Sequence, residues 1–288
     1  MTAAEWRVDD CAAAVPTLRA ELPNQERELT LLFLGDLHWD HALCNRAALK
    51  RVLTEAVDKQ AAIVLLGDQL CAMQGKNDKR GHKAALRPEH KVDAYFSAVV
   101  DDFAGWWEPY AKSTWLVLEG NHESSVRTYH EVDLTRLWVS RLNAGGACIQ
   151  YAGYSTYARV MIARHTRRTS VPFFVHHGHG GGGPVTRGTI QAQRRAVMYP
   201  DARFIVTGHI HSSYAVDHEQ YRVNDAGRPY VAVQEHLSTG TWKNEYGRGE
   251  GGWHVERGMG PRQASGWWCR FRVAGRNGDV RWSFEKAS

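Results

Sequence analysis

The stretch that decides the fold is LTLLFLGDLH (29–38), an apolar run that ends in Gly-Asp and is followed by a histidine. Similar runs recur as AAIVLLGD (61–68) and STWLVLEGNHE (113–123). Short continuous apolar runs suit strands that are buried on both faces of a sheet. The intervening segments 42–59 and 90–108 have helical composition or spacing. The order strand, helix, strand, helix, strand predicts an α/β protein with parallel βαβ units.

The three runs share one further property, because each ends in polar residues. In open α/β sheets, ligands bind beyond the carboxyl ends of the parallel strands. The polar exits 35–41, 67–69 and 119–123 should therefore lie on one edge of the sheet and form one shared site. Of two later strand-like stretches, 171–183 contains HHGH before a glycine-rich turn and 202–211 ends in GHIH. We expect both histidine motifs to reach the same edge.

The rest of the chain shows no solenoid repeat and no interdomain linker. We predict a polar lead-in over 1–28, with at most one helix, and a single domain over 29–288. The motifs occupy 29–236, and 237–288 holds a loop rich in Gly and Trp and further strands. Helical patterns cover 125–142 and 188–198, and strand-like patterns cover 148–163, 214–223, 229–236, 267–273 and 279–284.

Composition sets the broad class of the protein. The chain is 43% hydrophobic and 23% charged, which is ordinary for a soluble globular protein. With 36 Lys and Arg against 31 Asp and Glu, the net charge of +5 fits an anionic substrate such as nucleic acid, or a generic basic surface. Five scattered cysteines indicate neither a disulfide framework nor a zinc knuckle. This cysteine usage fits a reducing compartment, so we expect a cytoplasmic protein. No run reaches the roughly 18 apolar residues of a membrane span, so we expect no membrane partner.

The polar exits contain the donor groups of a metal site. Carboxylate, imidazole and amide oxygen together suit borderline divalent ions such as manganese, iron and zinc. The D-x-H spacing at 36–38 and the H-x-H spacing at 209–211 can place paired side chains on one side of a strand end. One such motif alone is more often structural, but five on one edge predict a shared metal centre.

The series GDLH, GD, GNHE, HGH and GHIH resembles the calcineurin-like metallophosphoesterase superfamily, whose pattern is D-x-H, G-D, G-N-H-[DE], H and G-H-x-H. The resemblance covers roughly residues 29–236, and the motif spacing with its basic loop also resembles phage- or prophage-type members. It implies a four-layer α/β/β/α sandwich with two mixed sheets and helices outside. It also implies a hydrolase of phosphate esters with two divalent ions, Mn²⁺ being the first expectation and Fe, Zn or Ni the alternatives.

The resemblance also assigns residues motif by motif. The first metal would be held by Asp36, His38 and His211, the second by Asn121, His177 and His209, and Asp68 would bridge the two. The fourth motif leaves His176, His177 and His179 open, and we choose His177 because it begins the HGH form. Strand alternation would point the neighbouring His176 to the opposite face.

Charge supports this assignment. Two divalent ions, the carboxylates of Asp36 and Asp68 and a bridging hydroxide sum to about +1, which would attract a phosphate. We expect the metal-bridging hydroxide to attack phosphorus and His122 to act as general acid on the leaving oxygen. In the basic loop 76–83, Arg80 is a candidate substrate contact because guanidinium forks suit phosphate. His179 is a second candidate.

Three functions remain open at this point. The excess of basic over acidic residues favours a phosphodiesterase that acts on nucleotides or nucleic acid. The alternative is a phosphomonoesterase, either for small molecules or for proteins, although Gln69 and Leu70 follow Asp68 where a protein phosphatase would soon place an arginine. A non-catalytic scaffold is the third reading, and the filled motif positions, His122 included, argue against it. The natural substrate, the metal and the oligomeric state do not follow from the sequence.

Overall fold

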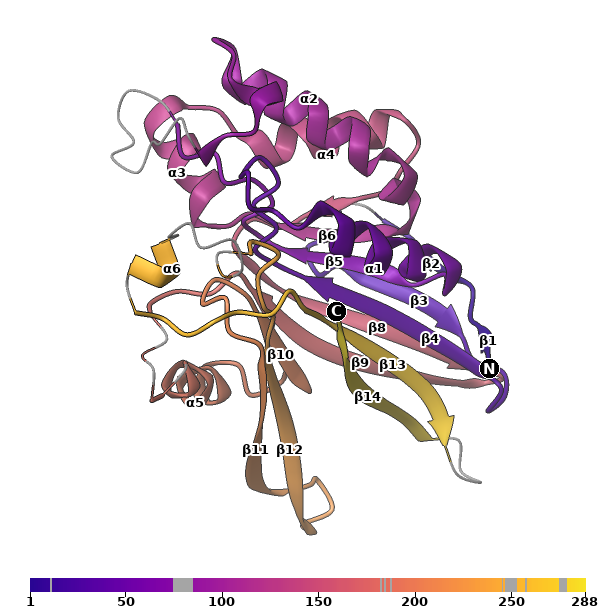
Figure 1. Ribbon diagram of the computed structural model, residues 1–288. Helices are drawn as coiled ribbons and strands as arrows, with labels where there is room; N and C mark the ends of the chain where they lie inside the picture. The colour runs from indigo at the N-terminus through magenta and orange to yellow at the C-terminus, as the bar shows by residue number, and fades with distance from the viewer. Residues whose placement is uncertain are drawn as a thin grey trace.

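The computed structural model describes residues 1–10, 12–74, 85–181, 183, 185–186, 188–244, 246, 253–256, 258–274 and 279–288. Within these residues the chain forms two seven-stranded mixed sheets that face one another, with helices on the outer sides (Figure 1). The α/β fold with two mixed sheets predicted from the resemblance is confirmed. The basic loop 76–83, with Arg80, lies outside the described residues.

The first sheet carries the three apolar runs. Its strands β4, β5 and β6 are mutually parallel, which confirms the predicted βαβ units. The strand order is β14 (Asp279–Ala287), β13 (Gly266–Ala274), β4 (Arg27–Leu34), β5 (Ala62–Leu66), β6 (Thr114–Leu118) and β7 (Gln150–Tyr151), with β1 (Thr2–Ala3) beside β4. Every residue of β5 and β6 is buried, as expected for strands covered on both faces.

The second sheet brings the two histidine motifs to the same edge. Its order is β11 (Tyr214–Val223), β12 (Pro229–Ser238), β10 (Phe204–Thr207), β9 (Arg167–His176), β8 (Ser155–Arg164), β3 (Thr17–Glu21) and β2 (Trp6–Val8). Because β9 and β10 are parallel, the HHGH and GHIH segments leave them side by side.

The helices are α1 (Arg46–Asp58), α2 (Tyr95–Trp107), α3 (Asn121–His130), α4 (Leu134–Ala144), α5 (Thr189–Met198) and the short α6 (Trp253–Glu256), with 3₁₀ turns at Pro88–His90 and Glu108–Ser113. The single helix expected over 125–142 is two helices. Glu131 ends α3 with a left-handed φ of 59°, and the Asp133 side chain caps the first turn of α4.

Two large apolar clusters and a small third one around Phe174 and Ile205 pack the sheets and helices together. Between the sheets, Phe173 and Phe204 stack with ring centroids 4.7 Å apart. On the other face of the first sheet, α1, α2 and α4 bury side chains such as Trp107 and Trp138. Figure 1 shows α5 beside β10 and β11 of the second sheet. Trp242, Trp267 and Trp268 are buried, so these three act in packing.

Two sequence expectations need correction. The lead-in holds the strands β1, β2 and β3 where at most one helix was expected, because Leu18 and Ala20 are buried when β3 pairs with β8. Cys44, Cys71 and Cys269 are free and buried, but Cys148 is disulfide-bonded. No helix among the described residues is long and apolar enough to cross a membrane.

Candidate metal centre

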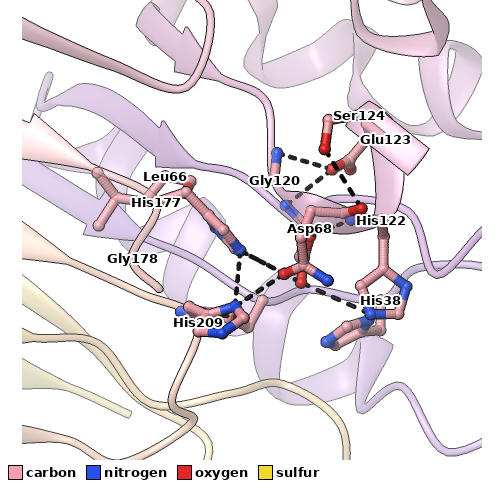
Figure 2. Close-up of polar contacts among 12 residues, drawn as sticks. His38, Leu66, Asp68, Gly120, His122, Glu123, Ser124, His177, Gly178 and His209 are labelled. Atoms are coloured by element: carbon pink, nitrogen blue, oxygen red, sulfur yellow. Dashed lines mark hydrogen bonds and ion pairs between the residues drawn. The ribbon is translucent and has the colours of Figure 1, made fainter. Parts of the chain in front are cut away.

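The five polar motifs meet at one edge, beyond the ends of β4, β5, β6, β9 and β10. Backbone hydrogen bonds tie the first two motifs together, since the N–H groups of Asp36 and His38 donate to the carbonyls of Gly67 and Asp68, each at 3.0 Å. In Figure 2, His177 and His209 lie on one side of Asp68, and His38 and His122 lie on the other. The shared site predicted from the strand ends is therefore present.

The backbone at this edge is strained in a localised way. Five non-glycine residues adopt left-handed φ angles between 49° and 72°, namely Asp36, His38, Asp68, His209 and His211. Such a conformation costs on the order of 1 kcal/mol per residue. The strain turns side chains of neighbouring strands toward one point, and strain of this kind concentrates at functional sites.

One cluster consists of Asp36, His38 and His211. The Nε2 atoms of His38 and His211 lie 3.1 Å apart, and His211 Nε2 lies 3.2 Å from Asp36 Oδ1. The backbone N–H of His209 donates to both oxygens of Asp36, at 3.1 and 2.9 Å. Burial, followed by the neighbouring imidazoles of His122 and His211, lowers the pKa of His38 well below its usual value. His38 is therefore neutral and can offer a lone pair.

A second cluster consists of Asp68, Asn121, His177 and His209. His177 Nδ1 lies 2.8 Å from the Leu66 carbonyl, so Nδ1 donates to that carbonyl and Nε2 is the ring nitrogen that faces the cluster. That Nε2 lies 3.0 Å from Asn121 Oδ1, 3.4 Å from Asp68 Oδ2 and 3.3 Å from His209 Nδ1. His209 Nδ1 lies 2.7 Å from Asn121 Oδ1. Nitrogen and oxygen atoms of four residues, each of a type that can bind a metal, thus converge on one point.

A cation fits both clusters. Lone pairs at these separations repel unless a proton or a metal ion lies between them, and the mixed nitrogen and oxygen donors suit borderline divalent metals. The groups Asp36, His38, His211 and Asp68, His177, His209 each bring three ligand atoms within 4.8 Å of one another. Burial lowers the pKa of His177, but the charges of Asp68 and Asp36 outweigh burial and raise it to about 9. Without a metal, His177 Nε2 therefore carries a proton, and the same negative charges would favour a metal cation in the place of that proton.

His122 lies at the rim of the site. Its backbone N–H donates to Asp68 Oδ1 at 3.0 Å, and its Nδ1 lies 2.5 Å from the Cys71 carbonyl. The other ring nitrogen, Nε2, is 3.8 Å from Asp68 Oδ2. The side chain is 13% exposed, whereas that of Asp68 is 2% exposed. His122 is therefore placed to present Nε2 to a ligand that reaches the site from solvent.

The motifs and their meeting point agree with comparison to known proteins. The family model described as calcineurin-like phosphoesterase matches residues 29–213. The chain belongs to the calcineurin-like phosphoesterase family. It is accordingly a metallophosphoesterase with Asp and His groups that can bind divalent metal. No curated protein sequence matches the chain.

Solved structures with similar folds come from distant organisms. Vps29 of Entamoeba histolytica in complex with Zn²⁺ is 12% identical, with 90% of this chain and 100% of that chain covered and a TM-score of 0.34. An uncharacterised predicted phosphoesterase of Streptococcus pneumoniae is 13% identical, covering 90% and 98%, with a TM-score of 0.33. GAP50, the anchor in the inner membrane complex of Plasmodium, is 11% identical, covering 90% and 88%, with a TM-score of 0.42.

Glu123 organises the backbone of this phosphoesterase site. It is 1% exposed, so it belongs to the buried framework of the site and not to the surface. Its carboxylate accepts the N–H groups of Asp68, Leu70 and Gly120 at 3.1, 2.9 and 2.9 Å. Burial and then the charge of Asp68 raise the pKa of Glu123 to about 8, while the amide donors of Leu70 and Gly120 oppose that rise. Glu123 thus joins the second and third motifs.

Gly67 permits the close approach of two motifs. Its φ is +98°, and an added Cβ would lie 2.5 Å from His177 Nδ1 and 2.7 Å from Gly120 Cα. A side chain at this position would collide with a residue of the second cluster and would also strain the backbone. The position before Asp68 therefore requires glycine for two reasons, the close approach of neighbouring atoms and the positive φ angle.

The remaining histidines of the fourth motif lie apart from both clusters. His176 accepts the backbone N–H of Gly178 at Nδ1, at 2.7 Å, and its ring centroid is 5.7 Å from that of His179. His179 is exposed. The structure therefore places His177, and neither of these two, in the second cluster. Substrate contacts by His179 and by Arg80 stay predictions.

Sequence reasoning missed the residues that support the motifs from outside them. Thr241 Oγ1 and the Trp242 N–H both donate to the Asp36 carbonyl at 3.0 Å, so the segment after β12 braces the first motif. The thiol of Cys71 lies within 4.8 Å of ring nitrogens of His38 and His122. Neither segment carries a recognisable spacing signal, because these contacts join positions that are distant in the chain.

Proposed function

We propose that this metallophosphoesterase hydrolyses phosphodiesters of nucleotides or nucleic acid at a dinuclear centre. Asp36, His38 and His211 would hold one ion, and Asn121, His177 and His209 would hold the other, with Asp68 shared between them. The observation that carries the proposal is the convergence of carboxylate, amide and imidazole groups in both clusters. The separations of 3.1 Å between His38 and His211 and of 3.3 Å between His177 and His209 leave room for a cation as common partner.

The proposed chemistry divides between the ions and the chain. Divalent ions, with Mn²⁺ as first expectation and Fe, Zn or Ni as alternatives, would lower the pKa of bound water and offset phosphate charge. His122 would donate a proton from Nε2 to the leaving oxygen, because its Nδ1 is engaged by the Cys71 carbonyl. Glu123 would keep Asp68 in register with the third motif.

The substrate class rests on charge. A net charge of +5 favours polyanionic substrates over small neutral ones. A phosphomonoesterase would use the same ligands, so the ratio of diester to monoester turnover decides between the two. A cytoplasmic location and a phage-type affiliation, expected from composition and motif spacing, stay predictions.

The test compares His122→Ala with Asp68→Asn on two kinds of ester. One kind has a nitrophenolate leaving group, which departs without a proton, and the other has an alkoxide, which needs one. His122→Ala should retain both metals and lose about 10²–10⁴-fold on the alkoxide ester, with a much smaller loss on the nitrophenyl ester. Asp68→Asn should lose metal from both sites and fail equally on both esters.

Metal content is measured alongside the rates, with Mn²⁺ supplied during purification and assay. If His122→Ala loses metal as Asp68→Asn does, or if its rate falls equally on both esters, His122 is not the general acid. If the wild-type enzyme turns over nitrophenyl phosphate faster than bis-nitrophenyl phosphate at saturating concentrations, the monoesterase alternative replaces the diesterase proposal.

A further inference from the structure

Asp40 is a buried carboxylate two residues after His38, and neither the motifs nor the clusters include it. It is fully buried, and its oxygens accept the backbone N–H of Cys71 at 2.5 Å, the backbone N–H of Ala72 at 2.9 Å and the hydroxyl of Tyr95 on α2. All three donors are neutral. Burial of a carboxylate is costly, and these three hydrogen bonds offset part of that cost. They also fix the positions of two consecutive backbone N–H groups.

One of those amides belongs to a peptide group that also contacts His122. The Ala72 N–H and the Cys71 carbonyl are the two polar ends of a single planar peptide. The N–H end donates to Asp40 Oδ2 at 2.9 Å, and the carbonyl end lies 2.5 Å from His122 Nδ1. In a trans peptide the two ends point in opposite directions, and the described residues contain no cis bond. Asp40 and His122 therefore lie at opposite ends of one rigid group.

The backbone conformation at this peptide needs support. Ala72 has a φ of 47°, a left-handed value that costs a non-glycine residue about 1 kcal/mol. The two hydrogen bonds to Asp40 hold the segment in that conformation. If they were lost, relaxation of Ala72 would rotate the peptide and turn the Cys71 carbonyl away from His122.

The orientation of this carbonyl decides which nitrogen of His122 faces the site. As long as Nδ1–H donates to Cys71, Nε2 is directed toward Asp68, at 3.8 Å from Oδ2. The negative charge of Asp40 also polarises the intervening peptide, which makes its carbonyl a stronger acceptor. Charge and geometry at Asp40 thus act on His122 through one peptide group.

We propose that Asp40 is a positioning residue for His122, which it orients through the Cys71–Ala72 peptide and without touching substrate or metal. The proposal rests on the proposed function of His122 as general acid. It assigns to Tyr95 a supporting part, because its hydroxyl holds the same carboxylate.

The experiment is a double-mutant cycle between Asp40→Asn and His122→Ala. An asparagine keeps the size of the side chain but offers one acceptor oxygen and one NH₂ donor to the two backbone N–H groups. Asp40→Asn should retain both metals and lose about 10- to 100-fold on an alkoxide-leaving diester. Its loss on bis-nitrophenyl phosphate should be small. In the His122→Ala background, Asp40→Asn should cause no further loss on either ester.

Asp102→Asn is the matched control. Asp102 is a carboxylate on the same helix as Tyr95. It accepts the indole N–H of Trp39 at 2.8 Å, lies 3.0 Å from His90 Nε2 and forms an ion pair with Arg46 at 3.2 Å. Its removal perturbs the same region of the fold without touching the Cys71–Ala72 peptide. Asp102→Asn should change thermal stability but not the ratio of rates on the two esters. Tyr95→Phe serves if Asp40→Asn does not fold, and it should show a smaller loss with the same dependence on leaving group.

The outcomes separate this proposal from the one on which it rests. If His122→Ala shows no dependence on leaving group, the general-acid role fails, whatever Asp40→Asn does. If His122→Ala shows that dependence and the Asp40 and Tyr95 variants do not, or if their losses add to that of His122→Ala, Asp40 has no positioning role.

Discussion

Replacing Gly120 by alanine should displace Asp68 and so reduce both activity and metal binding. Gly120 has φ −104°, which any residue can adopt, so its torsion angles give no reason for a glycine. The reason is space, because an added Cβ would lie 2.0 Å from Asp68 Oδ1 and 2.3 Å from Asp68 N. Real Cβ atoms essentially never approach a neighbour closer than 3.0 Å, so the third motif and Asp68 must separate by 3.0 − 2.0 = 1.0 Å or more.

That displacement sets the size of the effect. A misplacement of about 1 Å in a catalytic arrangement costs roughly 10²-fold in rate, and an overpacked buried site loses about 1–3 kcal/mol of stability. Since Asp68 is the residue shared between the two proposed ion sites, Gly120→Ala should also lower metal content. The assay combines hydrolysis of bis-nitrophenyl phosphate, metal analysis after dialysis against Mn²⁺, and thermal unfolding.

Gly105→Ala is the matched control. Gly105 lies in α2, and an added Cβ would meet nothing within 4 Å. Alanine should therefore leave activity and metal content unchanged and stabilise the helix by about 0.5–1 kcal/mol. If Gly120→Ala keeps its metal and a rate within about threefold of wild type, the close packing of Asp68 against the third motif does not govern the site, and the reasoning is refuted.

Three further results are expected. Glu123→Gln keeps only one of the two acceptor oxygens that serve the backbone N–H groups of Asp68, Leu70 and Gly120. Unfolding by denaturant should show that the free energy of unfolding falls by about 1–3 kcal/mol. A variant as stable as the wild type would contradict the role of Glu123 in joining the second and third motifs. Burial, followed by His218 and Arg195, lowers the pKa of His236 to about 4. As the pH falls, His236 therefore takes up a proton in the unfolded chain before it does so in the folded protein. Its contribution to the free energy of unfolding is fully present above pH 6.5. That contribution decreases between pH 6.5 and 4 by at most about 1.4 kcal/mol per pH unit. His236→Gln should make the free energy of unfolding depend less on pH in that window. If the curves of wild type and variant against pH run parallel, His236 is not the source of the pH dependence. Excess chelator should abolish hydrolysis and Mn²⁺ should restore it at least partly, whereas full activity in a metal-free protein would rule out metal dependence.

Local sequence predicted the parts of this protein that local physics controls. An apolar run such as AIVLL in β5 is buried on both faces whatever its neighbours are, and its polar exit must follow at the strand end. The periodicity of α2 and the donor groups at 36–38 and 209–211 are visible for the same reason. The edge on which the motifs meet also follows from sequence, because parallel strands share their direction.

Prediction was wrong where pairing partners are remote. The strand β3 forms because Leu18 pairs with Val160 of β8. The sequence of residues 1–28 contains no pattern that predicts this partner. The region 125–142 reads as one helix by periodicity, but Glu131 turns the chain with a left-handed φ of 59° between α3 and α4. In both cases a contact or conformation set by the tertiary fold outweighs local preference.

The amino-acid sequence alone determined which donor groups this phosphoesterase carries and on which edge of the sheets they emerge, since strand direction and residue type are local properties. Only the tertiary structure decided how those groups are aimed. His177 Nε2 meets Asn121 across 56 residues of chain, and Asp40 reaches Cys71 across 31. Such distances are set by the packing of two sheets and by left-handed turns at the strand ends. The motifs therefore determine which groups can bind a metal, whereas the orientation of each group depends on buried partners that lie outside the motifs.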